Sequence, residues 1–183
     1  MIVSETKHTQ RSKQMNDVIK NMLSRRSIRK FTSEEVSKET IELLLRAAMS
    51  APSACNQQIW RFLVVTDRQK LEKISTFHNG VKLIKDAPAA IVICGEPTKA
   101  TLDYYWLDDC GAATENVLLA AHSLGLGAVW TGINRENKEM LDFYRETLGI
   151  KGEYIPFSMI AFGYPAEAHT PRENYDENKV VWC

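Results

Sequence analysis

The sequence CGAATENVLLAAH, residues 110–122, is small and apolar around much of a helical circumference. It forms the middle of a longer segment, from about 102 to 124, that has the length and pattern of one helix. A helix that is apolar on so many sides has to be covered by other elements, because water would otherwise meet a large apolar surface. This stretch therefore predicts a helix in the centre of the molecule.

The segments on either side of this helix have the composition of β-strands. Residues 89–95, AAIVICG, are continuously apolar between Pro88 and Gly95, which is typical of a strand covered on both faces. Residues 60–66, WRFLVVT, are rich in β-branched and aromatic side chains. A turn with a further strand is expected at 125–132, and a last strand at 154–164.

Shorter helices are expected between and before these strands. Apolar residues recur at helical spacing in 15–24 and in 37–51, where Pro52 should end the helix because it disfavours the helical conformation of the residue before it. The other expected helices are at 67–75 and 134–148. This alternation predicts an α+β fold, with a mixed, mainly antiparallel sheet surrounded by helices.

The length of 183 residues suits one ordinary domain, which should bury roughly 70% of the surface of its unfolded chain. We expect a polar N-terminal arm at 1–14 and a single domain at 15–183. The last part of that domain, 165–183, is polar until VVW and has no helical pattern of its own. We expect this tail to pack on a neighbouring subunit, because its apolar end would otherwise be exposed.

The overall charge and composition exclude several classes of function. The chain has 23 Lys and Arg against 23 Asp and Glu, so it lacks the cationic surplus that binding to a nucleic acid requires. No apolar run approaches the roughly 20 residues of a bilayer span, and the N-terminal stretch has no apolar signal region. The four dispersed cysteines have no zinc-ligand spacing, which favours reduced thiols in a cytoplasmic protein and no metal site.

Residues 24–31, SRRSIRKF, stand out against this neutral background. Arg25, Arg26 and Arg29 place three guanidinium groups next to the hydroxyl of Ser27. Arginine binds phosphate through paired, charge-assisted hydrogen bonds, so the segment suits a phosphate ligand. Taken alone, however, the segment is better interpreted as a solvated helix end, at which the helix dipole stabilises cations.

A second candidate segment is APSACNQQ, residues 51–58. It combines Pro52, small side chains and amides that donate and accept hydrogen bonds, as the edge of a flat heteroaromatic ring requires, and it has equally the composition of an ordinary turn. Gly125, Gly127 and Gly132 are not a dinucleotide fingerprint, because they follow a helix and enter a strand. The four histidines are isolated in sequence, and each is expected to be structural or exposed.

Five segments together resemble the FMN-dependent nitroreductase family in their order and spacing. They are RRSIRKF, AAMSAPSACNQQIWRFLVV, DAPAAIVICG, DCGAATENVLLAAHSLGLGAVWTG and AFGYPAE. The resemblance extends from about Asn16 to Val180. It implies a mixed sheet surrounded by helices, an intertwined homodimer and one FMN at each of two sites in the dimer interface.

The resemblance also implies which residues hold the phosphate. Arg25, Arg26, Ser27 and Arg29 match the opening motif, which grips the phosphate and ribityl chain and reaches the pyrimidine edge of the flavin. Arg172 matches a late basic position that returns to the phosphate. Two positions later, Asn174 stands where the family often has a second cation, so phosphate binding is expected to depend more on Arg25 and Arg29.

For the flavin ring, the resemblance points to two further segments. Thr131 and Gly132 match a segment whose backbone lies beside the isoalloxazine near its reactive nitrogen. Ala54 stands where a second serine is common, which removes one hydroxyl contact. The loop that the other subunit contributes is matched by Pro52, Ser53, Ala54 and Asn56.

The function implied by the resemblance is that of an oxidoreductase. NADH or NADPH would reduce bound FMN and leave, and a small-molecule acceptor such as a nitroaromatic or a quinone would then take the electrons. Because the protein would supply binding and electrostatics, no catalytic side chain is expected. The alternatives are a non-catalytic flavin-binding protein and a specialised flavin-fragmenting or dehalogenating relative.

Overall fold

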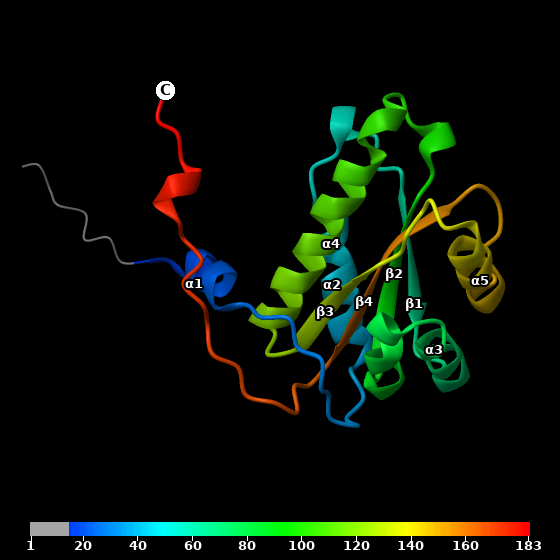
Figure 1. Ribbon diagram of the computed structural model, residues 1–183, viewed down its shortest axis with the longest axis horizontal. Helices are drawn as coiled ribbons and strands as arrows, with labels where there is room; N and C mark the ends of the chain where they lie inside the picture. Colours follow the sequence, from blue (N-terminus) through cyan, green and yellow to red (C-terminus); the bar gives the residue numbers. More distant parts are fainter. Residues whose placement is uncertain (1–14) are drawn as a thin grey trace, which may run out of the picture.

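The computed structural model describes residues 15–183, so the predicted polar arm at 1–14 lies outside the described residues. Four strands form one antiparallel sheet in the order β1-β2-β4-β3 (Figure 1). Their bounds are Trp60–Val65 for β1, Ala89–Gly95 for β2, Gly127–Gly132 for β3 and Ile155–Gly163 for β4. The expected strands are therefore confirmed to within about two residues at each end.

Strand β2 is buried at every position, as its continuous apolar sequence predicts. It pairs with β1 on one side and with β4 on the other, so both of its faces and both of its edges are covered. Strand β3 pairs only with β4 among the four strands and forms an edge of the sheet.

Helices cover both faces of the sheet, with α2 and α4 on one face and α3 and α5 on the other (Figure 1). Their bounds are Asp17–Ser24 for α1, Lys38–Met49 for α2, Arg68–Ser75 for α3, Trp106–Ser123 for α4 and Lys138–Leu148 for α5. Short 3-10 helices lie at Ala54–Asn56 (η1), Asn79–Asp86 (η2), Pro97–Lys99 (η3), Asp103–Tyr105 (η4) and Glu177–Lys179 (η5). This arrangement confirms the predicted α+β class.

The predicted central helix is α4. Its buried side chains include Ala113, Val117 and Ala121, which are fully shielded from solvent between α2 and the sheet. Small residues at these positions let the helix lie close to the strands, as the sequence predicts. Within the described residues, no helix is long and apolar enough to cross a membrane.

Helix α1 and the tail, residues 165–183, leave much apolar surface exposed. Helix α1 has no buried residue, although its sequence is amphipathic. In the tail, Val181 is 83% exposed and Trp182 is 90% exposed. Figure 1 shows the tail (orange to red) leaving the sheet on the same side as α1 (blue). Exposed apolar groups of this size are more typical of contact surfaces than of surfaces that face water alone.

Candidate cofactor site

The basic segment, residues 24–31, crosses the open edge of β3 between α1 and α2. The Ile28 N–H donates to the Ala128 carbonyl at 3.0 Å, and an isolated parallel bridge joins Ser27 to Ala128. This bridge is parallel, whereas the strand pairs of the sheet in residues 15–183 are all antiparallel. Ile28 is 3% exposed, so its burial anchors the segment in the core while Arg29 stays at the surface.

The tail returns to the same segment at its first residues. The Thr32 N–H donates to the Tyr164 carbonyl at 2.9 Å, and the Ala166 N–H donates to the Lys30 carbonyl at 2.9 Å. These two bonds align the end of β4 with the end of the basic segment. As a result, two parts of the chain that are far apart in sequence form the walls of one pocket.

This pocket, the basic pocket hereafter, has a volume of about 470 Å³. Four of the residues predicted to hold the phosphate lie in its wall: Arg26, Ser27 and Arg29 from the basic segment and Arg172 from the tail. The structure therefore brings three guanidinium groups and a hydroxyl around one space. The other wall residues are Ile28, Glu167, Ala168, His169, Thr170 and Pro171.

A carboxylate also lies in the wall of the basic pocket. Oε1 of Glu167 accepts the Arg29 N–H at 3.2 Å, and Oε2 lies 3.9 Å from Nζ of Lys30. The Glu167 carboxylate thus accepts a hydrogen bond from the backbone of the basic segment and connects the tail to that segment. With three guanidinium groups against this one carboxylate, the pocket keeps a positive balance that suits a phosphate.

Arg25 is placed differently from the other arginines of the motif. It is the C-cap of α1, and its Nε lies 3.4 Å from Oε1 of Glu115 on α4. It does not line the basic pocket. Two more contacts join the last turn of α1 to α4: Nδ2 of Asn21 donates to the Leu119 carbonyl at 2.9 Å, and Ser24 Oγ lies 2.8 Å from His122 Nε2.

The open edge of β3 presents backbone groups beyond the basic pocket. Because the Ala128 carbonyl bonds outward to Ile28, the two-residue alternation of an antiparallel ladder turns the backbone groups of Trp130 and Gly132 outward as well. Gly132 lies four residues from Ala128, or about 13 Å along an extended strand. A ligand with its phosphate in the pocket could extend along this edge to Gly132.

The two predicted ring-side residues of β3 have different surroundings. Thr131 is 8% exposed, and its Oγ1 donates to the Met159 carbonyl at 2.9 Å, so this side chain is used within the sheet. A Cβ on Gly132 would have nothing within 4 Å. The open space at Gly132 leaves room for a flat ring to approach the backbone closely, so these residues fit the ring of FMN.

The loop of residues 51–58 is held in an unusual backbone conformation. Cys55, Asn56 and Gln58 have φ values of 49°, 53° and 46°, a region that non-glycine residues adopt only at some energetic cost. The Ala54 N–H donates to Oδ1 of Asp109 at 2.8 Å, and the Gln58 N–H donates to Ser53 Oγ at 3.1 Å. Strain that persists because surrounding groups enforce it is a feature of binding sites.

Within one chain, this loop and the basic pocket do not meet. Asp109, in the first turn of α4, holds the loop, whereas His122, in the last turn, faces the tail residue His169, with ring centroids 6.0 Å apart. These two helix positions are about 20 Å apart at 1.5 Å per residue. The exposed residues Pro52 and Asn56 thus lie toward the other end of α4 from Arg29.

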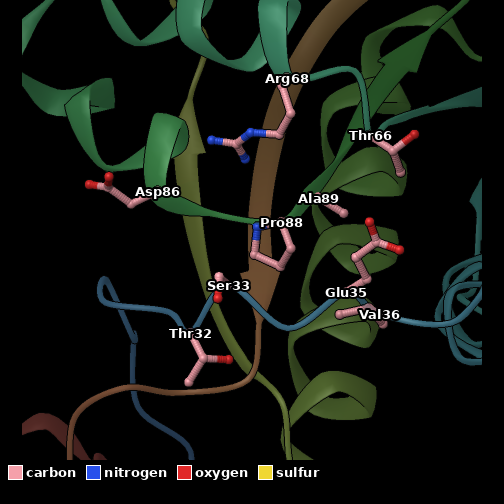
Figure 2. A pocket seen from close by; sticks show the side chains of 9 residues that line it. All are labelled: Thr32, Ser33, Glu35, Val36, Thr66, Arg68, Asp86, Pro88 and Ala89. Atoms are coloured by element: carbon pink, nitrogen blue, oxygen red, sulfur yellow. The ribbon is translucent and has the colours of Figure 1, made fainter.

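A larger cavity of about 580 Å³ lies elsewhere and contains none of the predicted site residues. Figure 2 shows Glu35 and Asp86 on opposite sides of this cavity, with Arg68 between α3 and η2. The Arg68 guanidinium donates to the carbonyls of Ala87 and Lys85, so it joins the start of α3 to the end of η2. These groups do not converge on a common point, and we assign the cavity no ligand.

Comparison with known protein families identifies the family to which this domain belongs. The model of the nitroreductase family matches residues 22–100 and 78–164 of this chain. The chain belongs to the nitroreductase family. The family resemblance drawn from the sequence is thereby confirmed.

Individual relatives of this nitroreductase-family chain cover most of its length. A protein of Methanothermobacter thermautotrophicus, provisionally named NADH dehydrogenase/NAD(P)H nitroreductase, is 43% identical over 164 residues, which are 90% of this chain and 85% of that relative. The FMN reductase (NAD(P)H) of Bacillus subtilis is 32% identical and covers 91% of this chain and 73% of its own length. An FMN-dependent nitroreductase structure from Clostridium difficile has a TM-score of 0.80 and 33% identity, covering 86% and 94% of the two chains.

Sequence reasoning missed several residues that shape the site of this nitroreductase-family chain. Asp109 reads as one of two acidic residues in the first turn of a helix, and only its burial at 3% exposure reveals its role. Glu167 belongs to the AFGYPAE segment quoted above, but nothing in its spacing indicates a bond to Arg29. His122 and His169 are isolated in sequence and were expected to be structural or exposed, and their spacing does not indicate that the fold places their ring centroids 6.0 Å apart.

Proposed function

We propose that this chain is an FMN-dependent oxidoreductase that uses NADH or NADPH to reduce nitroaromatics, quinones or similar acceptors in two separate steps. The observation that carries the proposal is the convergence of Arg26, Arg29 and Arg172 on one pocket. Relatives named NAD(P)H nitroreductase and FMN reductase support the same class of enzyme. The reaction would take place in the cytoplasm, in keeping with four free cysteines.

In this proposal, the residues of the chain bind and orient the cofactor. Bound FMN would supply the redox chemistry, by accepting a hydride from the nicotinamide and releasing two electrons to the acceptor. Arg26, Arg29 and Arg172, with Ser27, would hold the phosphate, and Arg25 would approach the same ligand from the end of α1. The backbone of Thr131 and Gly132 would lie beside the ring, where the outward N–H of Gly132 would stabilise developing negative charge. No side chain of the protein would exchange a proton with the substrate.

The proposal includes a homodimer of the single domain at 15–183. The loop carrying Pro52, Ser53, Ala54 and Asn56 would complete the site of the partner subunit, because in one chain it lies toward the other end of α4 from the basic pocket. The exposed apolar groups of α1 and of the tail at 165–183 would pack on the second copy. Burying them would remove apolar surface from water and so stabilise the dimer.

The decisive experiment is a titration of the purified protein with FMN, followed by steady-state kinetics. We expect an oxidised-flavin spectrum, tight binding of FMN and weaker binding of riboflavin. NADH or NADPH oxidation, measured against a panel of nitroaromatics and quinones, should give parallel double-reciprocal plots. Binding without turnover would favour a non-catalytic flavin protein, and turnover with halogenated phenols alone would favour a dehalogenating enzyme. Protein that neither binds FMN nor gains thermal stability from it would refute the proposal.

A further inference from the structure

An imidazole faces the basic pocket from the tail, at a position for which neither the sequence pattern nor the comparisons give a role. His169 lines the pocket three residues before Arg172 and is exposed to solvent. Asn174, two residues after Arg172, has no charge and does not line the pocket. The tail therefore contributes two nitrogen-containing basic side chains to the basic pocket, Arg172 and His169.

The groups around His169 come from three parts of the fold. The basic segment contributes the guanidinium groups of Arg26 and Arg29 across the pocket. The tail itself contributes the Glu167 carboxylate and the Arg172 guanidinium. Helix α4 contributes His122, whose ring centroid lies 6.0 Å from that of His169 at an interplanar angle of 63°.

His122 is suited to remain neutral beside His169. Partial burial lowers the pKa of His122, and the positive charges of His169 and Arg25 lower it further. Its Nε2 is hydrogen-bonded to Ser24 Oγ at 2.8 Å, which fixes the ring between α1 and the tail. Arg25 is itself paired with Glu115. The lowered pKa favours the neutral form of His122, whose ring lies beside that of His169.

We propose that His169 is a further phosphate-binding residue of this chain, and that in its protonated form it supplies the tail-side positive charge that Asn174 lacks. This inference rests on the proposed binding of FMN. A phosphate monoester offers three terminal oxygens, and each accepts more than one hydrogen bond. The three arginines of the pocket do not have to use every acceptor position of the phosphate oxygens. An N–H of the His169 imidazolium can donate to a position that remains.

The proposal makes the preference for a phosphorylated flavin depend on pH. A protonated imidazole carries a positive charge that the neutral form lacks, so the contribution of His169 to phosphate binding should be larger at acidic than at basic pH. A phosphate monoester also takes up a proton near about pH 6, which weakens its binding at lower pH. Because that effect is common to all variants, the comparison of variants at each pH isolates the part due to His169.

The experiment measures the dissociation constants of FMN and of riboflavin by flavin fluorescence, from about pH 6.5 to about pH 8.5. The quantity of interest is their ratio, since riboflavin lacks the phosphate. For His169→Gln, we expect the preference for FMN to fall about five- to tenfold at the lower pH and less than about twofold at the higher pH. His169→Lys carries a permanent charge, so its preference should stay high over the whole range.

The matched control is His78→Gln, because His78 caps η2 through Gly80 and does not line the basic pocket. Its preference for FMN should follow that of the original chain at each pH. An unchanged preference in a folded His169→Gln protein that still binds FMN would overturn the role of His169 alone. If the original chain binds neither FMN nor riboflavin, the proposed function fails and this inference fails with it. A His169→Lys protein with the same pH dependence as the original chain would also contradict it.

Discussion

The buried carboxylate of Asp109 accepts the backbone N–H of Ala54 at 2.8 Å. Its other oxygen accepts Nε2 of Gln57 at 2.7 Å, and Asp109 is 3% exposed. In Asp109→Asn, an amide N–H₂ would face one of these donors, so we expect the free energy of unfolding to fall by about 2–4 kcal/mol. Urea denaturation would measure the change.

Asp108→Asn is the matched control for this substitution, because Asp108 is the exposed neighbour of Asp109 in the same first turn of α4. It removes the same charge near the helix N-terminus without removing a bond to the loop. We expect a loss of less than about 1 kcal/mol. Equal losses for the two variants would show that the helix dipole, and not the loop, accounts for the effect.

The phosphate-binding role of the pocket arginines can be tested one residue at a time. Arg29→Ala and Arg172→Ala each remove a guanidinium from the wall of the basic pocket. We expect each to weaken FMN binding by about 1.5–3 kcal/mol and riboflavin binding much less. Arg25→Ala is the informative comparison, because Arg25 pairs with Glu115 outside the pocket wall. A similar loss of both flavins in Arg25→Ala would assign that arginine to the joint between α1 and α4.

Gly132 and Gly127, at the two ends of β3, should respond differently to the same change. Gly132→Ala meets no atom within 4 Å, so the protein should fold normally, but the new methyl group should hinder the approach of the flavin ring. In Gly127→Ala, the new Cβ would lie 2.6 Å from Cγ2 of Ile28, which should lower stability by about 1–3 kcal/mol. Thermal denaturation and FMN titration of both proteins measure the two effects. A Gly132→Ala protein with unchanged affinity would remove Gly132 from the site.

Subunit exchange can test whether the site is shared between two chains. Arg29→Ala removes a group of the basic pocket, and Asn56→Ala changes the loop that would enter the partner's site. If both segments serve one site from different subunits, a hybrid dimer should contain one site with both segments intact. Mixing the two variants, at an FMN concentration at which each alone is largely unoccupied, should then restore part of the NAD(P)H oxidation. A monomer with full flavin occupancy in sedimentation, or no recovery after verified exchange, would contradict the shared site.

The surroundings of His122 predict a pH dependence of stability. Burial, together with His169 and Arg25, lowers the pKa of His122, so around about pH 6 the unfolded chain binds more protons at this residue than the folded chain. Stability should therefore rise with pH through this region and fall on acidification. His122→Gln should remove this component from urea unfolding curves measured between about pH 5 and 8. His78→Gln serves as the control, and a His122→Gln protein with the same or a steeper pH dependence would exclude the effect.

Much of the fold could be predicted because its elements are strongly patterned. The continuous apolar run of β2 and the small, apolar circumference of α4 place both elements in the core, where they are found. The turn composition of η1 is also visible in the sequence. The strand order β1-β2-β4-β3 could not be predicted in the same way, because the local pattern of a strand does not specify which strand pairs with it.

The candidate site was predictable only in part. Arginines with a neighbouring serine suit a phosphate but equally a solvated helix end, and only the resemblance carried by several segments favoured the phosphate; Arg26, Ser27 and Arg29 do line a common pocket. The pairing of Arg25 with Glu115 and of Arg29 with Glu167 depends on contacts between distant segments. The sequence alone does not show whether a charged side chain faces a ligand or an oppositely charged residue. Only the tertiary structure distinguishes these two environments.

The long sequence separation of the two pocket walls has a consequence for the biosynthesis of the protein. Arg29 and Glu167, which meet in that wall, are 138 positions apart. A ribosome makes the first wall early, and domains begin to fold during synthesis from their N-terminal side. The basic pocket nevertheless lacks its second wall until the chain has been translated through Arg172. Cofactor loading therefore has to follow translation through Arg172, so a product terminated before that residue could fold its sheet and still remain without cofactor.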